Sequence, residues 1–115
     1  MKSNEAVIAL AALAQDSRLA IFRALVRRGP QGLTPGVLAA KLGIAAATLS
    51  FHLKELQHAH LVEARREGRF LYYSAQFDHM RSLVGFLTDE CCSEADAECD
   101  STCKPVAAAV KRRSA

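Results

Sequence analysis

The sequence predicts a mainly α-helical protein with a small β-hairpin. Five segments carry apolar residues at helical spacing, and one pair of short β-type segments flanks a glycine turn. Half of the 115 residues are apolar, but only seven are aromatic and none is tryptophan. A core of Ala, Leu, Val and Ile suits packed helices, and the length allows one compact domain.

Cap residues place the first two helices. Residues 5–14 read as a short apolar helix. Asp16 is a good N-cap for a second helix, which runs to about Arg28 and is stopped by Gly29-Pro30. We therefore expect two helices separated by a tight corner.

The third and fourth helices follow closely on each other. Thr34 before Pro35 is an N-cap with proline at the first helical position, and Gly43 ends this third helix. A fourth helix begins within two or three residues and runs to about His58. We expect it to bury the face that carries the i, i+4, i+7 residues Leu49, Leu53 and Leu56.

The periodicity then changes to that of strands. Residues 61–66 and 69–75 are strand candidates separated by the turn signal Glu67-Gly68. A last helix is predicted from about Phe77, with Cys91-Cys92 at its end. Its apolar stripe consists of Met80, Leu83, Val84 and Leu87.

Charge is unevenly distributed along the chain. Residues 1–88 hold 11 Lys/Arg and 6 Asp/Glu, a balance of +5, whereas residues 89–100 hold six acidic residues and no basic one. A basic body favours a polyanionic partner. We predict one domain at residues 1–92 and a flexible tail at residues 93–115, where apolar periodicity is lost.

The N-terminus has some features of an export signal. Lys2 followed by the apolar stretch 6–14 loosely resembles a signal peptide, but Glu5 borders it and the same residues suit an amphipathic helix. No run approaches the roughly 20 apolar residues of a membrane span. We expect a cytoplasmic protein without a membrane partner, whose cysteines are normally reduced.

Two short helices, a longer helix and a basic hairpin in this order predict a winged helix-turn-helix that binds DNA. The third helix braces the fourth, whose outer face enters the major groove. The alternative is an amphipathic helix with a solvated arginine tip and no ligand. The side chains expected at DNA are Thr48, Ser50, Phe51, His52 and Lys54 on the helix, and Arg66 and Arg69 beside Arg65 on the hairpin.

Residues 49–74, LSFHLKELQHAHLVEARREGRFLYYS, resemble the recognition helix and wing of the ArsR/SmtB family of metal-sensing repressors. Asp16-Ser17-Arg18-Leu19 also resembles the start of the family's second helix. His60 stands where the family usually has Gly, and Ala46 and Ala47 stand where relatives often have polar residues. The matching positions are Ser50, His52, Leu53, Leu56, Ala59, Leu61, Val62, Arg66, Gly68, Arg69 and Tyr73.

The resemblance implies a homodimer through the first and last helices, bound to a palindromic operator as a repressor. The surplus of apolar residues on those two helices agrees with this. An enzyme is not expected, since neither a Cys-x-x-Cys motif nor a cysteine on a phosphate-cradling loop is present.

The family senses metals at several alternative sites. The Cys-x-Cys of many arsenic-responsive members is absent, because residues 37–40 are Val-Leu-Ala-Ala. Asp78, His79, Asp89 and Glu90 have only a passing likeness to the zinc site of other members, and a polar surface is the preferred interpretation of them.

All four cysteines lie in the C-terminal region. A resembling subset of arsenic-responsive repressors uses adjacent cysteines plus a third about six residues on. This implies that Cys91, Cys92 and Cys99 bind trivalent arsenic or antimony as the inducer, with Cys103 as a spare or alternative ligand. Trivalent arsenic takes three thiolates in a trigonal pyramid. No organic cofactor is expected.

Other signals stay open at this stage. The sulfur set would also fit cadmium, lead or zinc, or a dithiol redox switch, and incidental cysteines in a tail are the last alternative. The acidic neighbours disfavour a reactive thiolate. Arsenite arrives as neutral As(OH)3 and exchanges three hydroxyls for three thiols with no net proton release, so it tolerates protonated thiols.

Overall fold

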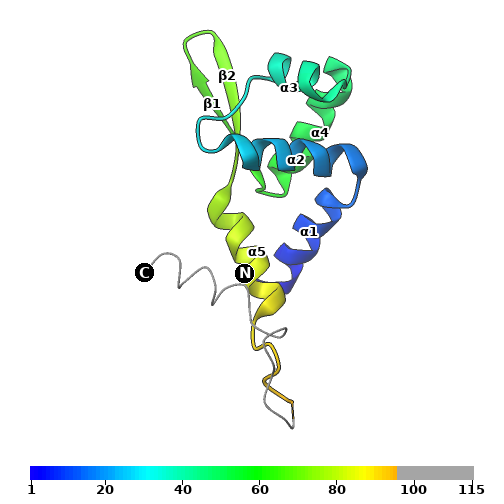
Figure 1. The fold of residues 1–115 in the computed structure, drawn as a ribbon, viewed down its shortest axis with the longest axis vertical. Helices are drawn as coiled ribbons and strands as arrows, with labels where there is room; N and C mark the ends of the chain where they lie inside the picture. Colours follow the sequence, from blue (N-terminus) through cyan, green and yellow to red (C-terminus); the bar gives the residue numbers. More distant parts are fainter. Residues whose placement is uncertain (96–115) are drawn as a thin grey trace.

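The computed structural model describes residues 1–95 and confirms the mainly helical fold with one hairpin. In Figure 1, α2 to α4 and the hairpin form a body, while α1 and α5 extend together from one end of it. Residues 96–115, most of the predicted tail, lie outside the described residues. The elements are α1 (Ser3–Leu13), α2 (Asp16–Arg28), α3 (Pro35–Leu42), α4 (Ala46–His58), β1 (Val62–Glu67), β2 (Phe70–Ala75) and α5 (Phe77–Thr88).

The N-terminal cap of α2 is another residue than the one that the sequence suggested. Asp16 was expected to cap α2, but it is the first helical residue, and the Gln15 side chain accepts the Arg18 N–H at 2.9 Å. In the first turn of α2, the negative charge of Asp16 still interacts favourably with the positive end of the helix dipole. At α1 the backbone N–H of Lys2 donates to the Glu5 carboxylate at 2.7 Å, and this bond holds the pKa of Glu5 below its ordinary value.

One apolar core holds the helices together, and α4 lies at its centre. Leu49, Leu53 and Leu56 are all almost fully buried, which confirms the expected inner face of α4. Each such side chain contributes about 1.5–3 kcal/mol when it leaves water. The other fully buried large side chains are Ile21, Leu25, Leu38 and Leu61.

The connection between α3 and α4 is a tight turn. Thr34 caps α3 as expected, accepting the Val37 N–H at 3.4 Å, and Pro35 occupies the first turn. Gly43 ends α3 at φ +66, a left-handed conformation that glycine adopts without strain. The turn sets the two helices at 111° to each other. No single helix in residues 1–95 is long and apolar enough to cross a membrane. Taken together, α3 and α4 reach the required length and apolar composition, but the pair is sharply bent at the turn between them.

The hairpin is antiparallel, with Val62 opposite Ala75 and Glu67 opposite Phe70. The turn is therefore Gly68–Arg69, one residue later than the predicted Glu67–Gly68. Gly68 has φ +63, and a two-residue hairpin turn requires this sign at its first position.

A short bridge fastens the hairpin to the body. Leu33 and Tyr73 exchange two backbone hydrogen bonds of 2.9 Å. The chain approaches so closely that a Cβ on Gly32 would lie 2.5 Å from the Tyr73 carbonyl oxygen. Glycine is therefore required before the bridge.

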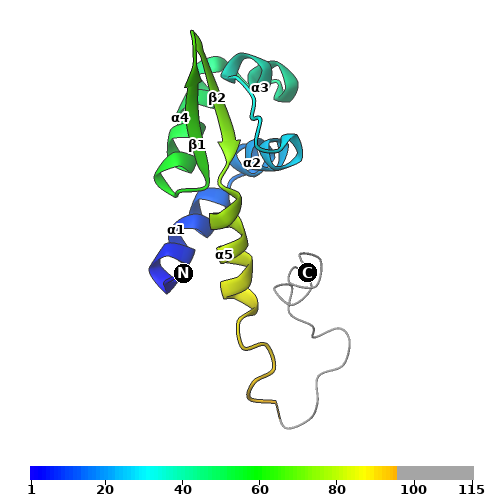
Figure 2. The same ribbon diagram turned by 90° about the vertical axis from the view of Figure 1, so that its left-hand side faces the viewer.

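Helix α5 ends earlier than expected. The sequence places Cys91-Cys92 at the end of the helix, but α5 stops at Thr88, and the chain continues beyond it without helix (Figure 2). Both cysteines lie in the turns that follow. Asp89 leaves the helical conformation at φ −59 and ψ 134, and the carboxylates of Asp89 and Glu90 interact unfavourably with the negative end of the helix dipole. The Thr88 hydroxyl donates back to the Val84 carbonyl at 3.0 Å and closes the last turn.

Candidate nucleic-acid interface

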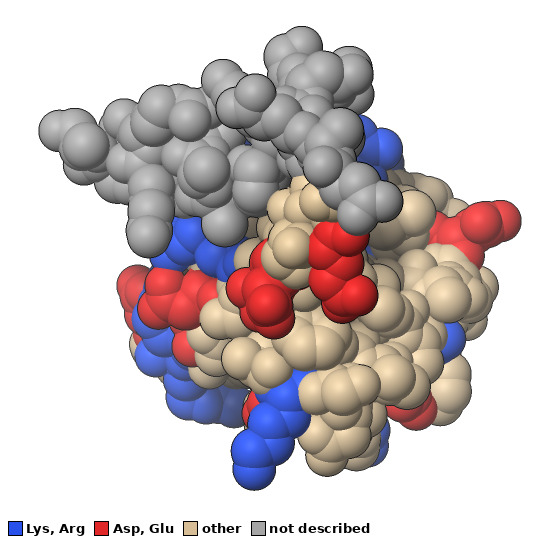
Figure 3. Space-filling view, turned by 90° about the horizontal axis from the view of Figure 1, so that it is seen from below, with Lys and Arg blue, Asp and Glu red and all other residues tan. Residues whose placement is uncertain are grey.

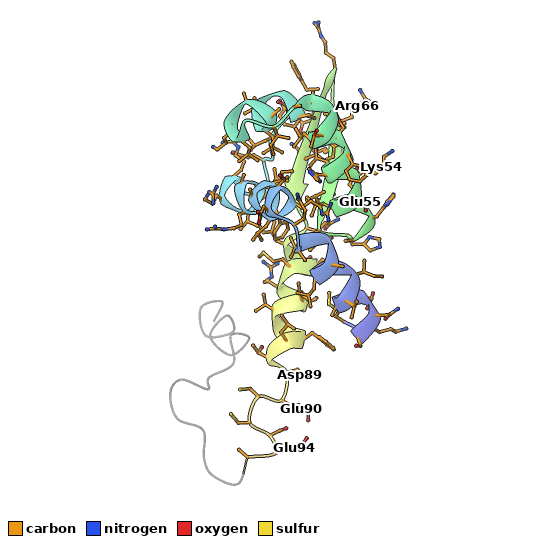
Figure 4. All side chains as sticks on the ribbon, turned by 90° about the vertical axis from the view of Figure 1, so that its right-hand side faces the viewer. Lys54, Glu55, Arg66, Asp89, Glu90 and Glu94 are labelled. Atoms are coloured by element: carbon orange, nitrogen blue, oxygen red, sulfur yellow. The ribbon has the colours of Figure 1, made fainter. Side chains whose placement is uncertain are left out.

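The outer face of α4 carries an exposed polar strip opposite the buried leucines. Thr48, Ser50 and Lys54 are exposed, as the sequence predicted, and Phe51 is 55% exposed. Figure 4 shows Lys54 extending outward from α4 on the side where Arg66 leaves the hairpin. Hydroxyls and an ammonium group suit bases and phosphates, while an exposed phenyl ring suits a thymine methyl group.

The predicted position of His52 on the outer face of α4 is wrong. The side chain is only 7% exposed and points into the body. Its ring Nδ1 lies 3.4 Å from Nη1 of Arg18 on α2. The spacing of Leu49, His52, Leu53 and Leu56 in fact follows one helical stripe, so the pattern contained the signal for an inward histidine.

The start of α4 has no side-chain cap and no polar side chain in its first two positions. Its N-cap is Ala45, which provides no side-chain hydrogen bond, and Ala46 and Ala47 are exposed in the first turn. Relatives with polar residues here would offer extra side chains to DNA. In this chain the methyl groups of Ala46 and Ala47 offer no polar side chain at these positions.

The three hairpin arginines divide into two kinds. Arg66 and Arg69 are exposed, as predicted. Arg65 lies 5.3 Å over the Tyr72 ring, and it donates to the Gln31 carbonyl at 3.0 Å. Arg65 therefore ties the wing to the α2–α3 connection, and strand alternation directs its neighbour Arg66 to the opposite face.

The acidic end of the described chain is far from this surface. Figure 4 shows Asp89, Glu90 and Glu94 beyond α5, at the opposite end of the molecule from Arg66. The Sγ atoms of Cys91 and Cys92 lie 3.6 Å apart between these acidic residues. Cys99 and Cys103, the other two predicted ligands, lie outside the described residues.

The zinc-type positions do not converge within one chain. Asp78 pairs with Arg81, and the His79 ring lies 5.9 Å from the His60 ring. Within residues 1–95, no three His, Cys, Asp or Glu side chains are arranged to hold a metal ion. His60 itself has φ +62, a left-handed conformation that glycine adopts without strain, so glycine suits this position after α4.

Comparison with known proteins identifies the architecture. A helix-turn-helix domain model matches residues 13–65. The nodulation protein NolR of Rhizobium meliloti is 35% identical over 99 residues, which are 84% of this chain and 79% of NolR. An ArsR-like transcriptional regulator from a Rhodococcus species superposes with a TM-score of 0.69 at 25% identity, over 96% of this chain and 92% of that one.

The chain belongs to the ArsR/SmtB family. A possible ArsR-family regulator from Mycobacterium bovis, solved as a homodimeric winged helix-turn-helix DNA-binding domain, is 31% identical with a TM-score of 0.60. That comparison covers 84% of this chain and 89% of the other. Members of the ArsR/SmtB family are DNA-binding transcriptional regulators and not enzymes, so α4 is the recognition helix and the hairpin is the wing.

We predict that Arg66→Ala and Arg69→Ala each weaken binding to all DNA sequences. Loss of one phosphate contact should flatten the slope of log affinity against log salt by about 0.9. Fluorescence anisotropy with a specific and a random duplex, at several salt concentrations, measures both effects.

Arg23→Ala is the matched control, because Arg23 is exposed on α2 beside Met80 and Leu83, on the side toward α5. It should leave the slope unchanged. Parental slopes and affinities in both wing variants would contradict the assignment of the wing to DNA.

Proposed function

We propose that this chain is a homodimeric repressor of operator DNA, released when trivalent arsenic or antimony binds its C-terminal cysteines. The observation that carries the proposal is the adjacent pair Cys91-Cys92, whose sulfurs lie 3.6 Å apart immediately beyond α5. All four cysteines of the chain are within 13 residues, from Cys91 to Cys103. A repressor body with thiols only at this end fits a sensor better than a structural use of cysteine.

The dimer is supported by apolar side chains that the single chain leaves in water. On α1, Val7 is 61% exposed and Ile8 is 52% exposed, and on α5 Leu87 is 58% exposed. Figure 3 views the molecule from the end where these helices project, and uncharged side chains cover much of the described surface there. A second copy would bury them, in line with the M. bovis homodimer. Two recognition helices related by a two-fold axis would read a palindromic operator.

The sulfur geometry is compatible with one soft ion. Two thiolates that bind the same ion at about 2.3 Å cannot be more than about 4.6 Å apart, and the Cys91 and Cys92 sulfurs are within this limit even with Cys92 in a disulfide. Trivalent arsenic then needs one more thiol, which we assign to Cys99. Arsenite suits the acidic surroundings of Asp89, Glu90 and Glu94, because neutral As(OH)3 does not require ionised thiols.

Release from DNA would follow from the position of this pair. The cysteines begin three residues after Thr88, and Leu87 of the proposed dimer surface is in the last turn of α5. Drawing the thiols around an ion would shift that last turn and the subunit arrangement that it supports. A coupling free energy of about 1–3 kcal/mol is typical of such regulation.

For the dimer, we predict that Leu87→Glu gives monomers with at least about tenfold weaker operator binding. An unpaired carboxylate in an apolar interface costs several kcal/mol. Sedimentation velocity measures the mass, and circular dichroism checks the fold.

Arg81→Glu is the matched control, since Arg81 is exposed on the charged side of the same helix beside Asp78. It should remain dimeric. A folded, dimeric Leu87→Glu protein would argue against an interface on α5.

For the sensor, we predict that serine at Cys91, Cys92 or Cys99 leaves DNA binding intact and abolishes release by arsenite. Two remaining thiols can still hold arsenic, so residual arsenic binding without release is expected. Cys103→Ser should respond nearly as the parent does. The protein must first be reduced, because Cys92 is disulfide-bonded in this structure.

The titration of operator-bound protein should include arsenite, antimonite, cadmium, zinc and peroxide. Arsenite affinity should change little between about pH 6.5 and about pH 7.5, unlike the affinity of a divalent metal that displaces protons from thiols. Release by cadmium or zinc alone would favour a divalent-metal sensor, and release by peroxide alone would favour a redox switch. Either of these two outcomes would refute the arsenic assignment. Release by arsenite of the variant with serine at Cys91, Cys92 and Cys99 together would also refute it.

A further inference from the structure

One guanidinium joins three helices near the recognition helix. Arg18, in the first turn of α2, donates from Nε to the Ala12 carbonyl at 2.6 Å. Its Nη1 lies 3.4 Å from Nδ1 of His52 on α4. Arg18 thus contacts the last turn of α1 on one side and the buried side of α4 on the other.

The contact with His52 defines the state of that histidine. Arginine has donors and no acceptor, so in this contact Nδ1 of His52 is the acceptor, which corresponds to the Nε2–H tautomer. His52 is 7% exposed, and its ring lies 5.6 Å from the ring of Phe51, which faces outward from the same helix. The hydrogen bond therefore fixes a buried side chain next to a residue expected at DNA.

The contact with Ala12 has a physical reason as well. The last four carbonyls of a helix have no intrahelical partner, and Ala12 is in the last turn of α1. A charged donor satisfies this carbonyl at the corner between α1 and α2. Movement of the α1 end would therefore pull directly on the Arg18 side chain.

We propose that Arg18 and His52 are positioning residues that couple the placement of α1 to the angle at which α4 meets DNA. The inference rests on the proposed function, in which α1 contributes to the dimer surface and α4 reads the operator. Val7 and Ile8 place that surface on the helix whose far end Arg18 holds. A change in subunit packing then reaches the recognition helix through one side chain.

A double-mutant cycle tests the coupling on an operator duplex selected in vitro with the parent protein. Arg18→Met keeps an apolar stem and removes the donors, whereas His52→Leu removes the acceptor. Each should weaken operator binding by about 10- to 150-fold, as expected for loss of a hydrogen bond to a charged group. The double variant should bind the operator no more weakly than the single variant with the lower affinity. Multiplying effects, or a lower unfolding temperature with parental affinity, would overturn the proposal.

Conservative rescue separates positioning from packing. His52→Asn keeps an acceptor close to the position of Nδ1 and should bind within about twofold of the parent. The difference in affinity between His52→Asn and His52→Leu distinguishes positioning from packing even if Arg18→Met fails to fold. His58→Leu is the control, since His58 is exposed on α4 and lines the same surface hollow as Arg18 and Glu55. It should bind like the parent.

A spectroscopic readout does not depend on DNA. Long-range nitrogen–proton correlation spectra of the parent should assign the Nε2–H tautomer to His52, and Arg18→Met should disturb it. A proton on Nδ1 in the parent would overturn the inference. A parent that binds no DNA would refute the proposed function together with this coupling, whereas DNA binding with independent, multiplying effects would refute the coupling alone.

Discussion

The burial of the leucine face of α4 is the interaction on which the rest of this molecule depends. Leu49, Leu53 and Leu56 fix the helix in the core through packing that is essentially complete. Because that face is fully used, the opposite face is free to present hydroxyls, Lys54 and a phenyl ring to a ligand. A recognition helix needs this combination, since a loosely held helix would lose affinity in ordering itself on the DNA.

The wing is held to the same core by backbone and side-chain contacts. The Leu33–Tyr73 bridge requires Gly32 beside it, and Arg65 braces the outer part of the hairpin against the α2–α3 connection. These contacts orient the hairpin relative to α4, so that Arg66 lies on the same side of the molecule as Lys54 of α4 (Figure 4). Without these contacts the hairpin could change its angle to the body, and Arg66 and Arg69 would have no defined position.

Sequence patterns predicted the elements well and their ends less well. The leucine spacing, the Thr34-Pro35 start and the Gly43 stop all correspond to local chemistry that the chain carries by itself. The bridge between Leu33 and Tyr73 joins residues 40 positions apart, and no local pattern predicts it. His52 was misplaced because a histidine was read as polar surface, although Arg18, distant in the sequence, supplies the partner that allows its burial.

The end of α5 was predicted too late. The sequence pattern extends α5 to Cys91-Cys92, whereas Thr88 and the acidic residues after it end the helix earlier. Cys91 and Cys92 consequently sit in turns, with Cys92 at φ +64, and not on a regular helix face. Asp89, Glu90 and Glu94, which flank Cys91 and Cys92 in the sequence, lie at the opposite end of the molecule from Arg66 (Figure 4), so α1 and α5 are the elements that can connect the two ends.

The central claim is that two copies of α4 and the wing engage one duplex. Hydroxyl-radical and methylation footprinting of reduced protein on a selected operator tests it most directly. The account predicts two protected patches on one face of the duplex, about one helical turn apart, with major-groove protection at their centres and minor-groove protection beside them. A single patch, or protection confined to the minor groove, would contradict it.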